Sequence, residues 1–141
     1  MDRVEILLPA AALVGVTALV WVRLYVERLG EMRARHIDPQ SLASARQAAA
    51  QLEHTQAADN FRNLFEVPVL FYLLCLCLAL TGPVTQFFVD SAWGFVMLRA
   101  AHSFVHVTYN KVLHRFALYA ASTLLLFVMW ARYALDLTAG R

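Results

Sequence analysis

The stretch VPVLFYLLCLCLALTGPVTQFFV, residues 67–89, decides the fold, because it holds no charged residue and is divided by Thr81-Gly82-Pro83. A membrane-crossing helix needs about 20 apolar residues to pass through about 30 Å of hydrocarbon. A flexible glycine followed by a proline that favours a helix start marks a short turn. The stretch therefore predicts that one membrane-spanning helix ends here and that the next begins directly after it.

The rest of the chain follows the same pattern. Residues 6–22 and 116–131 are also uncharged, and residues 86–110 are interrupted only by Asp90 and Arg99. Hydrophobic residues make up 60% of the 141 positions, and the mean hydropathy is +0.55, far above the norm for soluble proteins. We predict an all-α membrane protein of one domain, 1–141, whose bundle of four transmembrane helices covers about residues 5–27, 62–82, 84–110 and 114–136.

The basic residues orient this bundle. Four crossings place both termini on one side of the membrane and the two helix-connecting loops on the other. Basic residues concentrate in and beside those loops, whereas the termini carry only Arg3, Arg132 and Arg141; the loop side holds Arg28, Arg33, Arg35, Arg46, Arg62, Lys111 and Arg115. The positive-inside rule puts the loops, including the long loop 29–60, in the cytoplasm. In a bacterium this predicts an integral protein of the inner membrane, and a net charge of +2 does not suggest nucleic acid as a partner.

The long loop is expected to be partly helical. Pro39 interrupts it, and residues 41–58 are rich in alanine. Ser41 is a suitable N-cap, and this helix is expected to continue from the cytoplasm straight into the second span.

Polar residues inside the third span are the first functional signal. Arg99, His102, His106 and Asn110 are spaced so that a helix with about 3.6 residues per turn places them on one face. An ionisable residue at membrane depth is costly unless it finds partners or water, so such a stripe is a functional-site hypothesis.

The predicted topology brings polar residues from all four spans to the cytoplasmic half of the membrane. On the second span Asp59, Arg62, Asn63 and Glu66 share one face. A cluster that is cationic on balance and open to the cytoplasm suits a small anionic ligand held by charge-assisted hydrogen bonds. Besides the stripe, the predicted cluster contains Arg23, Arg62, Asn63, Glu66 and Arg115.

Structural explanations stand beside this hypothesis. Arg23 is suitably spaced to pair with Glu27 one turn later or to reach the interface, Arg115 can serve as a basic anchor next to its loop, and Arg99 can form a structural ion pair with Glu66. Each of these explanations would exclude one residue from the ligand site. The sequence does not decide between them and ligand binding.

The two histidines have three possible roles. The i,i+4 spacing of His102 and His106 is compatible with a metal or a haem, with hydrogen-bonded helix packing, or with ligand binding. No second histidine pair and no H-E-x-x-H motif accompanies them, and the nearby arginines would repel a cation. We therefore predict no metal site and keep a haem- or metal-binding bundle as an alternative.

Several motifs together resemble the MAPEG family, the membrane-associated proteins in eicosanoid and glutathione metabolism, and are most similar to its bacterial members. They are Asp59-Asn60-Phe61-Arg62-Asn63-Leu64-Phe65-Glu66-Val67-Pro68, then Arg99-x2-His102-Ser103-x2-His106-Val107-Thr108-Tyr109-Asn110, and Arg115-Phe116. The resemblance covers nearly the whole chain. It implies a left-handed four-helix bundle that assembles as a homotrimer, with glutathione bound between adjacent subunits in the cytoplasmic half of the membrane.

The resemblance also implies roles for individual residues. Arg115 matches the arginine that stabilises the glutathione thiolate, and the remaining matched positions are expected to bind the tripeptide: Arg23, Arg62, Asn63, Glu66, Arg99 and His102. A cation beside the thiol lowers its pKa and makes it a better nucleophile. An apolar electrophile or a lipid hydroperoxide is then expected to enter from the lipid.

Two departures limit what the resemblance implies. His106 stands where the eicosanoid-forming members usually have a tyrosine, and Phe116 follows Arg115 where the prostaglandin-forming member has a serine. We therefore expect a general glutathione transferase or peroxidase, with His106 in the binding wall, and not leukotriene or prostaglandin synthesis. The alternative of another class is a non-catalytic membrane protein that binds an anionic lipid or metabolite in the same pocket.

Overall fold

The computed structural model describes residues 4–82 and 84–140 of the chain, and all of its regular structure is helical. Arg3, Pro83 and Arg141, on which parts of the turn and charge predictions rest, lie outside the described residues. In chain order the elements are α1 (Leu7–Arg35), the 3-10 helix η1 (Pro39–Leu42), α2 (Ala45–Gln51), α3 (Gln56–Asn63), α4 (Val67–Thr81), α5 (Gln86–Val107) and α6 (Val112–Thr138).

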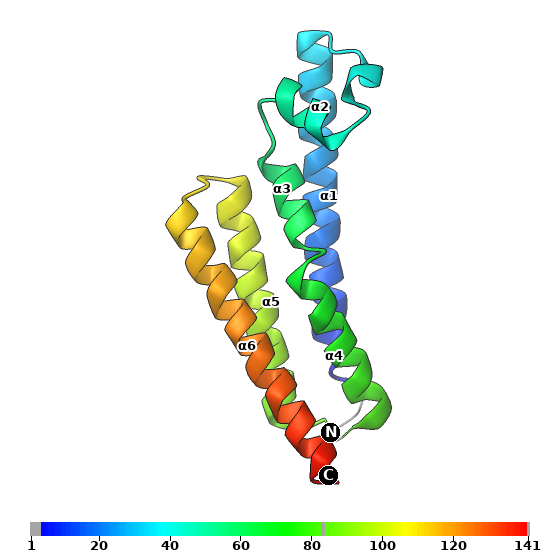
Figure 1. Ribbon diagram of the computed structural model, residues 1–141, viewed down its shortest axis with the longest axis vertical. Coiled ribbons are helices and arrows are strands. Elements are labelled where there is room, and N and C mark those ends of the chain that lie inside the picture. The colour runs from blue at the N-terminus through cyan, green and yellow to red at the C-terminus, as the bar shows by residue number, and fades with distance from the viewer. Residues whose placement is uncertain (1–3, 83, 141) are drawn as a thin grey trace.

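The long helices α1, α4, α5 and α6 form an elongated bundle (Figure 1). The beginning of α1 and the end of α6 lie at one end of it, and η1, α2 and α3 lie towards the other end (Figure 1). This confirms the predicted all-α four-helix class with both termini on one side.

Within residues 4–82 and 84–140, three helical stretches are long and apolar enough to cross a membrane: Leu7–Arg35, Gln56–Thr81 and Val112–Thr138. The helix α5 is not among them, because Asp90, Arg99 and two histidines lower its mean hydropathy. Yet α5 packs against α1, α3 and α6 and contains more buried residues than any other helix. Arg99 and the two histidines are therefore accommodated inside the protein instead of in lipid, whereas Asp90 is exposed near the start of α5.

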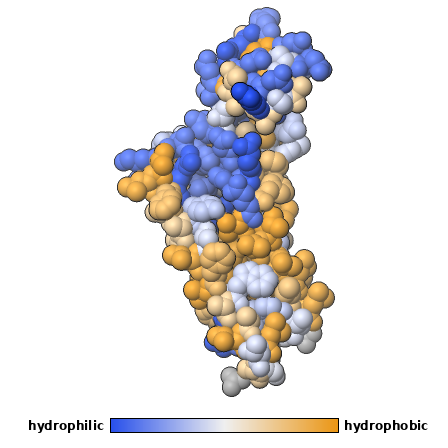
Figure 2. Space-filling view, in the orientation of Figure 1, coloured by the Kyte–Doolittle hydropathy of each residue, from blue (hydrophilic) through white to orange (hydrophobic). Residues whose placement is uncertain are grey.

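The apolar side chains are divided between the core and the outer surface. Phe71 of α4 stacks on Phe95 of α5 with ring centroids 4.4 Å apart, and both are fully buried. Outward-facing residues such as Leu19, Leu80 and Leu124 are more than half exposed. Figure 2 shows this hydrophobic surface over the bundle and a hydrophilic surface at the end that carries α2 and α3. The protein therefore presents to its surroundings a surface suited to lipid.

The long loop 29–60 is not the single helix that the sequence suggested. Ser41 lies inside η1, and the N-cap of α2 is Ser44, whose side chain forms a capping box with Gln47. The expectation of one helix running from Ser41 into the second span is wrong, because the chain leaves helical geometry three times: at Ser44 between η1 and α2, between α2 and α3, and between α3 and α4.

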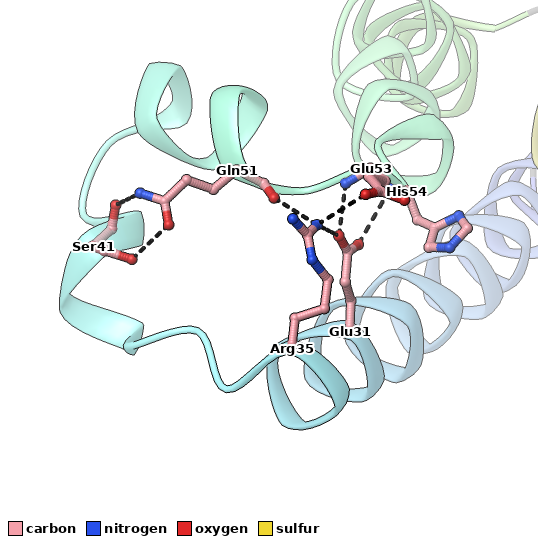
Figure 3. Close-up of polar contacts among 6 residues, drawn as sticks. All are labelled: Glu31, Arg35, Ser41, Gln51, Glu53 and His54. Carbon is pink, nitrogen blue, oxygen red and sulfur yellow. Dashed lines mark hydrogen bonds and ion pairs between the residues drawn. The ribbon is translucent and has the colours of Figure 1, made fainter.

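Contacts from the end of α1 fix this loop. The Glu31 carboxylate accepts hydrogen bonds from the main-chain N–H groups of Glu53, at 2.7 Å, and His54, at 3.2 Å. Arg35 donates to the Gln51 carbonyl at 2.8 Å and pairs with Glu31 at 2.6 Å. Figure 3 shows both side chains extending from α1 to residues 51–54. The last turns of α1 therefore hold the segment between α2 and α3.

Candidate functional site

The inner face of α5 carries a buried polar cluster. Arg99, His102, Ser103 and His106 are each at most 4% exposed, and their spacing places them along one side of the helix. Asn110 does not belong to this helical face, because α5 ends at Val107. Three of the four stripe residues thus enter the bundle from α5, and the fourth lies in the loop that follows.

Arg99 is fully buried but only partly satisfied. Its Nη2 donates to the main-chain carbonyl of Asn63 at 2.8 Å, and its guanidinium carbon lies 5.4 Å from the centre of the Tyr119 ring. The Nε and Nη1 atoms have no hydrogen-bond partner within the described residues. A guanidinium has five donor hydrogens, so this side chain retains unused capacity to bind an anion.

A helix break supplies the carbonyl that Arg99 binds. The helix α3 ends at Asn63, and α4 begins at Val67 with Pro68 in its first turn. Proline has no N–H and disfavours helical geometry in the preceding residue. At the break the Asn63 carbonyl accepts only a long main-chain bond, from the Glu66 N–H at 3.4 Å, so it can also accept from Arg99, and a cation there suits the helix dipole.

The two histidines lie together beside Arg99. Their ring centroids are 5.6 Å apart and the rings are nearly perpendicular. His102 donates from Nδ1 to the Arg115 main-chain carbonyl at 3.0 Å, so in the neutral ring Nε2 is an acceptor. The Nε2 atom of His102 and the Nδ1 atom of His106 are buried without hydrogen-bond partners in the described part of the chain. Two ring nitrogens therefore remain available in the interior.

The cluster includes residues that the sequence reasoning did not select. Ser103 donates to the Asn60 side-chain oxygen at 3.2 Å, and Asn60 is fully buried. Tyr119 contacts both Arg99 and the His102 ring. Two spacings in the sequence could have indicated these residues. Asn60 lies three residues before Asn63, and Tyr119 lies four residues after Arg115, so each shares a helix face with a predicted site residue.

Arg115 stands at the edge of this cluster that is next to the turn between α5 and α6. It is half-buried near the start of α6, and its Nη1 donates to the Asn110 side-chain oxygen, while its Nε is buried without a partner in the described region. Asn110 has a φ of 49°, a left-handed conformation that asparagine tolerates better than most residues. The turn after α5 therefore places an acceptor directly against the Arg115 guanidinium.

The other predicted binding residues point outward in the single chain. Arg23 is exposed and pairs with Glu27 at 2.8 Å, Arg62 is exposed and lies 4.0 Å from Asp59, and Glu66 is exposed at the start of α4. Arg23 also borders a groove of about 250 Å³ between α1 and α5. Ser103 of the α5 cluster lines the same groove as Arg23, but no hydrogen bond or ion pair joins the side chains of Arg23, Arg62 or Glu66 to that cluster within the described residues.

Two of the ion pairs that would give Arg23 and Arg99 a purely structural role can be compared with these contacts. The salt bridge of Arg23 with Glu27 is present, whereas no ion pair within 4.0 Å joins Arg99 to Glu66 among the described residues. Within the described residues, no three or more His, Cys, Asp or Glu side chains form a group that could hold a metal ion. The interior cluster thus consists of cationic and neutral hydrogen-bonding groups.

The fold and the cluster define a polytopic α-helical membrane protein with a buried, cationic polar cluster towards the end of its bundle that carries α3 and the turn between α5 and α6. A sequence comparison is more specific: the family model described as MAPEG family matches residues 6–135. The chain belongs to the MAPEG family. No curated protein and no solved structure matches the chain.

Proposed function

We propose that this protein is a membrane-embedded, glutathione-dependent transferase or peroxidase that acts on an apolar electrophile or a lipid hydroperoxide. The MAPEG family supports a membrane function related to glutathione in general terms. The observation that carries the finer proposal is Arg115, a half-buried guanidinium held by Asn110 at the edge of a cluster of unsatisfied polar groups.

Arg115 is proposed to stabilise the glutathione thiolate. A cation beside a thiol favours its ionised form, which is the nucleophile. The buried Nε of Arg115 and the surrounding low-polarity helices strengthen an interaction with an anion, because water screens it less there. Asn110 supports this role because it fixes the guanidinium before substrate binds.

The remaining cluster is proposed to bind the tripeptide. Arg99 offers two unpaired nitrogens and His102 and His106 offer one each, which suits a ligand with carboxylates and amides. Glutathione is net anionic, so the cationic site favours it over neutral thiols.

A homotrimer is proposed to complete the site. Arg23, Arg62 and Glu66 are predicted binding residues, yet they are exposed on the single subunit. In a cyclic oligomer each subunit presents such a surface to its neighbour. Sites between subunits would bring these side chains against the α5 cluster.

Both reactions follow from one thiolate. In a transfer, sulfur forms a bond to an electrophilic carbon while the displaced group leaves with the bonding electrons. In a peroxidase cycle, sulfur attacks the hydroperoxide, yielding an alcohol and a sulfenic acid, and a second glutathione condenses with that acid to give a disulfide and water. The apolar electrophile reaches the thiolate from the lipid side in either case.

Turnover of a chlorodinitrobenzene acceptor by the detergent-solubilised protein with glutathione tests the proposal. We expect Arg115→Gln to retain most glutathione binding, measured by calorimetry, and to lose at least about tenfold in conjugation rate, equal to about 1.4 kcal/mol of transition-state stabilisation.

Arg33→Gln is the matched control, because Arg33 is an exposed arginine near the end of α1 and its loss should leave the rate unchanged. Absence of glutathione binding to the unaltered protein would contradict the proposal. If glutathione binds but no acceptor or hydroperoxide is turned over, the non-catalytic alternative is correct.

A further inference from the structure

A second cavity lies in the cytoplasmic part of the protein. It has a volume of about 390 Å³ and is enclosed by the second half of α1, by α2 and by α3. Small-molecule sites commonly measure about 300–1,000 Å³. The cavity is therefore large enough for a small organic ligand.

The charged lining of this cavity is predominantly basic. Arg28, Arg46 and Arg62 line it together with His54, and Asp59 is its only carboxylate among the lining residues described. Arg62 and Asp59 are both more than half exposed and 4.0 Å apart, so their interaction is weak. The cavity consequently has an excess of positive charge.

Two of these arginines lack a partner on the protein. Neither Arg28 nor Arg46 forms an ion pair in the described part of the chain. The Nε atom of Arg28 is buried and has no hydrogen-bond partner there. Arg28 and Arg46 both line the cavity, and a guanidinium without an acceptor on the protein can bind an anion through charge-assisted hydrogen bonds.

The wall opposite α1 is held in place by a separate set of contacts. Glu31 binds the main-chain N–H groups of Glu53 and His54, and Arg35 binds the Gln51 carbonyl (Figure 3). These bonds fix the segment that carries Leu52 and His54, which line the cavity. The cavity is thus preformed, which reduces the entropy lost on binding.

We propose that this cavity binds the phosphate group of a small organic ligand, independently of glutathione. The planar guanidinium matches a phosphate in a bidentate manner, and a doubly charged phosphate balances the two unpaired arginines. Its apolar walls, which include Leu24, Ala48 and Leu52, fit an organic body. Arg62 is the one lining residue that also belongs to the predicted glutathione set, so it stays unchanged in the test.

Binding of pyrophosphate to the full chain in neutral detergent is the first measurement. We expect millimolar pyrophosphate to raise the unfolding temperature, with or without saturating glutathione. The double variant Arg28→Gln/Arg46→Gln should raise the Kd at least about tenfold, as expected when charge-assisted hydrogen bonds are lost. Arg46→Gln alone changes an exposed side chain and should weaken binding by a smaller factor without affecting folding.

Arg33→Gln is the matched control, because Arg33 is an exposed arginine of α1 that does not line the cavity; its Kd should equal that of the unaltered chain. A Kd that is the same in the double variant overturns the proposal. So does pyrophosphate binding that Arg115→Gln abolishes and the double variant leaves intact, because the anion then occupies the glutathione site.

Nanodiscs distinguish the two sources of the phosphate. If nanodiscs of phosphatidylglycerol give a higher unfolding temperature than nanodiscs of phosphatidylcholine, and the double variant loses this difference, the bound phosphate belongs to a lipid headgroup. Stabilisation by pyrophosphate without this lipid effect identifies a soluble phosphate compound. Absence of both effects overturns the proposal.

Discussion

At the scale of single residues, the interior of the bundle contains more polar side chains than the packing of its helices requires. Arg99, His102, His106 and Asn60 each have a buried polar atom without a hydrogen-bond partner in the described chain. Such atoms lower stability, and their concentration on one side of α5 is typical of a binding site. The sequence predicted this cluster from the position of Arg99 and the histidines within an apolar stretch. Asn60 and Tyr119 were not predicted, because an asparagine before a span and a tyrosine within one are common without function.

Replacement of Arg99 separates binding from folding. We expect Arg99→Met to have an unchanged or higher unfolding temperature in detergent, because a buried, poorly satisfied charge carries a large desolvation penalty. The same variant should lose stabilisation by millimolar glutathione. A marked fall in the unfolding temperature, with glutathione binding retained, would mean that Arg99 only caps α3.

Asn110 is expected to position Arg115. Asn110→Gly keeps a residue that adopts the left-handed conformation but removes the acceptor for the guanidinium. We expect kcat for conjugation to fall about tenfold, as for the loss of a hydrogen bond to a charged group, with little change in KM for glutathione. Asn110→Asp, which retains an acceptor, should restore most of kcat, and equal losses in both variants would argue against a positioning role.

At the scale of elements, the interruptions between helices are harder to predict from the sequence than the helices themselves. The long helices follow from uncharged apolar runs, which the sequence displays directly. The separation of α3 from α4 depends on Pro68 and on the binding of the Asn63 carbonyl by Arg99 from α5, a contact between residues far apart in sequence. The division of the long loop between α1 and α4 depends likewise on Glu31, which reaches it from α1. Local patterns do not contain such long-range hydrogen bonds.

The Glu31 contacts predict a local stability effect. Glu31→Gln weakens the acceptor of two main-chain N–H groups and removes an ion pair, so the loop should lose about 1.5–3 kcal/mol of local stability. Hydrogen exchange of residues 44–55 should become at least about tenfold faster. Glu53→Gln is the control, because the Glu53 side chain is exposed and its contact with Arg35, at 3.5 Å, is longer than that of Glu31. Similar acceleration of exchange in both variants would count against a special role for Glu31.

At the scale of the whole molecule, the apolar and the basic surfaces occupy different parts of the single chain. The bundle exposes apolar side chains along its length, and the basic residues gather at the end with α2 and α3 (Figure 2). The membrane class and the end at which the site lies could be predicted from hydropathy and charge. The grouping of Arg23, Arg62 and Glu66 with the α5 cluster remains a prediction, because it depends on contacts between subunits.

Mixing of two inactive variants tests sites shared between subunits. If Arg23 and Arg115 of one site come from neighbouring subunits, random co-assembly of Arg23→Gln and Arg115→Gln chains in equal amounts should restore about a quarter of the conjugation activity. Each variant alone serves as the inactive reference. Activity no higher than the mean of the two separate variants would place both residues of a site in one subunit.

The ultraviolet absorbance of the glutathione thiolate at neutral pH tests the central claim most directly. Glutathione added to the unaltered protein should produce thiolate absorbance in proportion to the sites occupied, because Arg115 favours the ionised thiol. Arg115→Gln should bind glutathione and lack this absorbance. Bound glutathione that stays protonated in the unaltered protein, or that ionises equally in Arg115→Gln, would contradict the assignment of Arg115 as the group that activates the thiol.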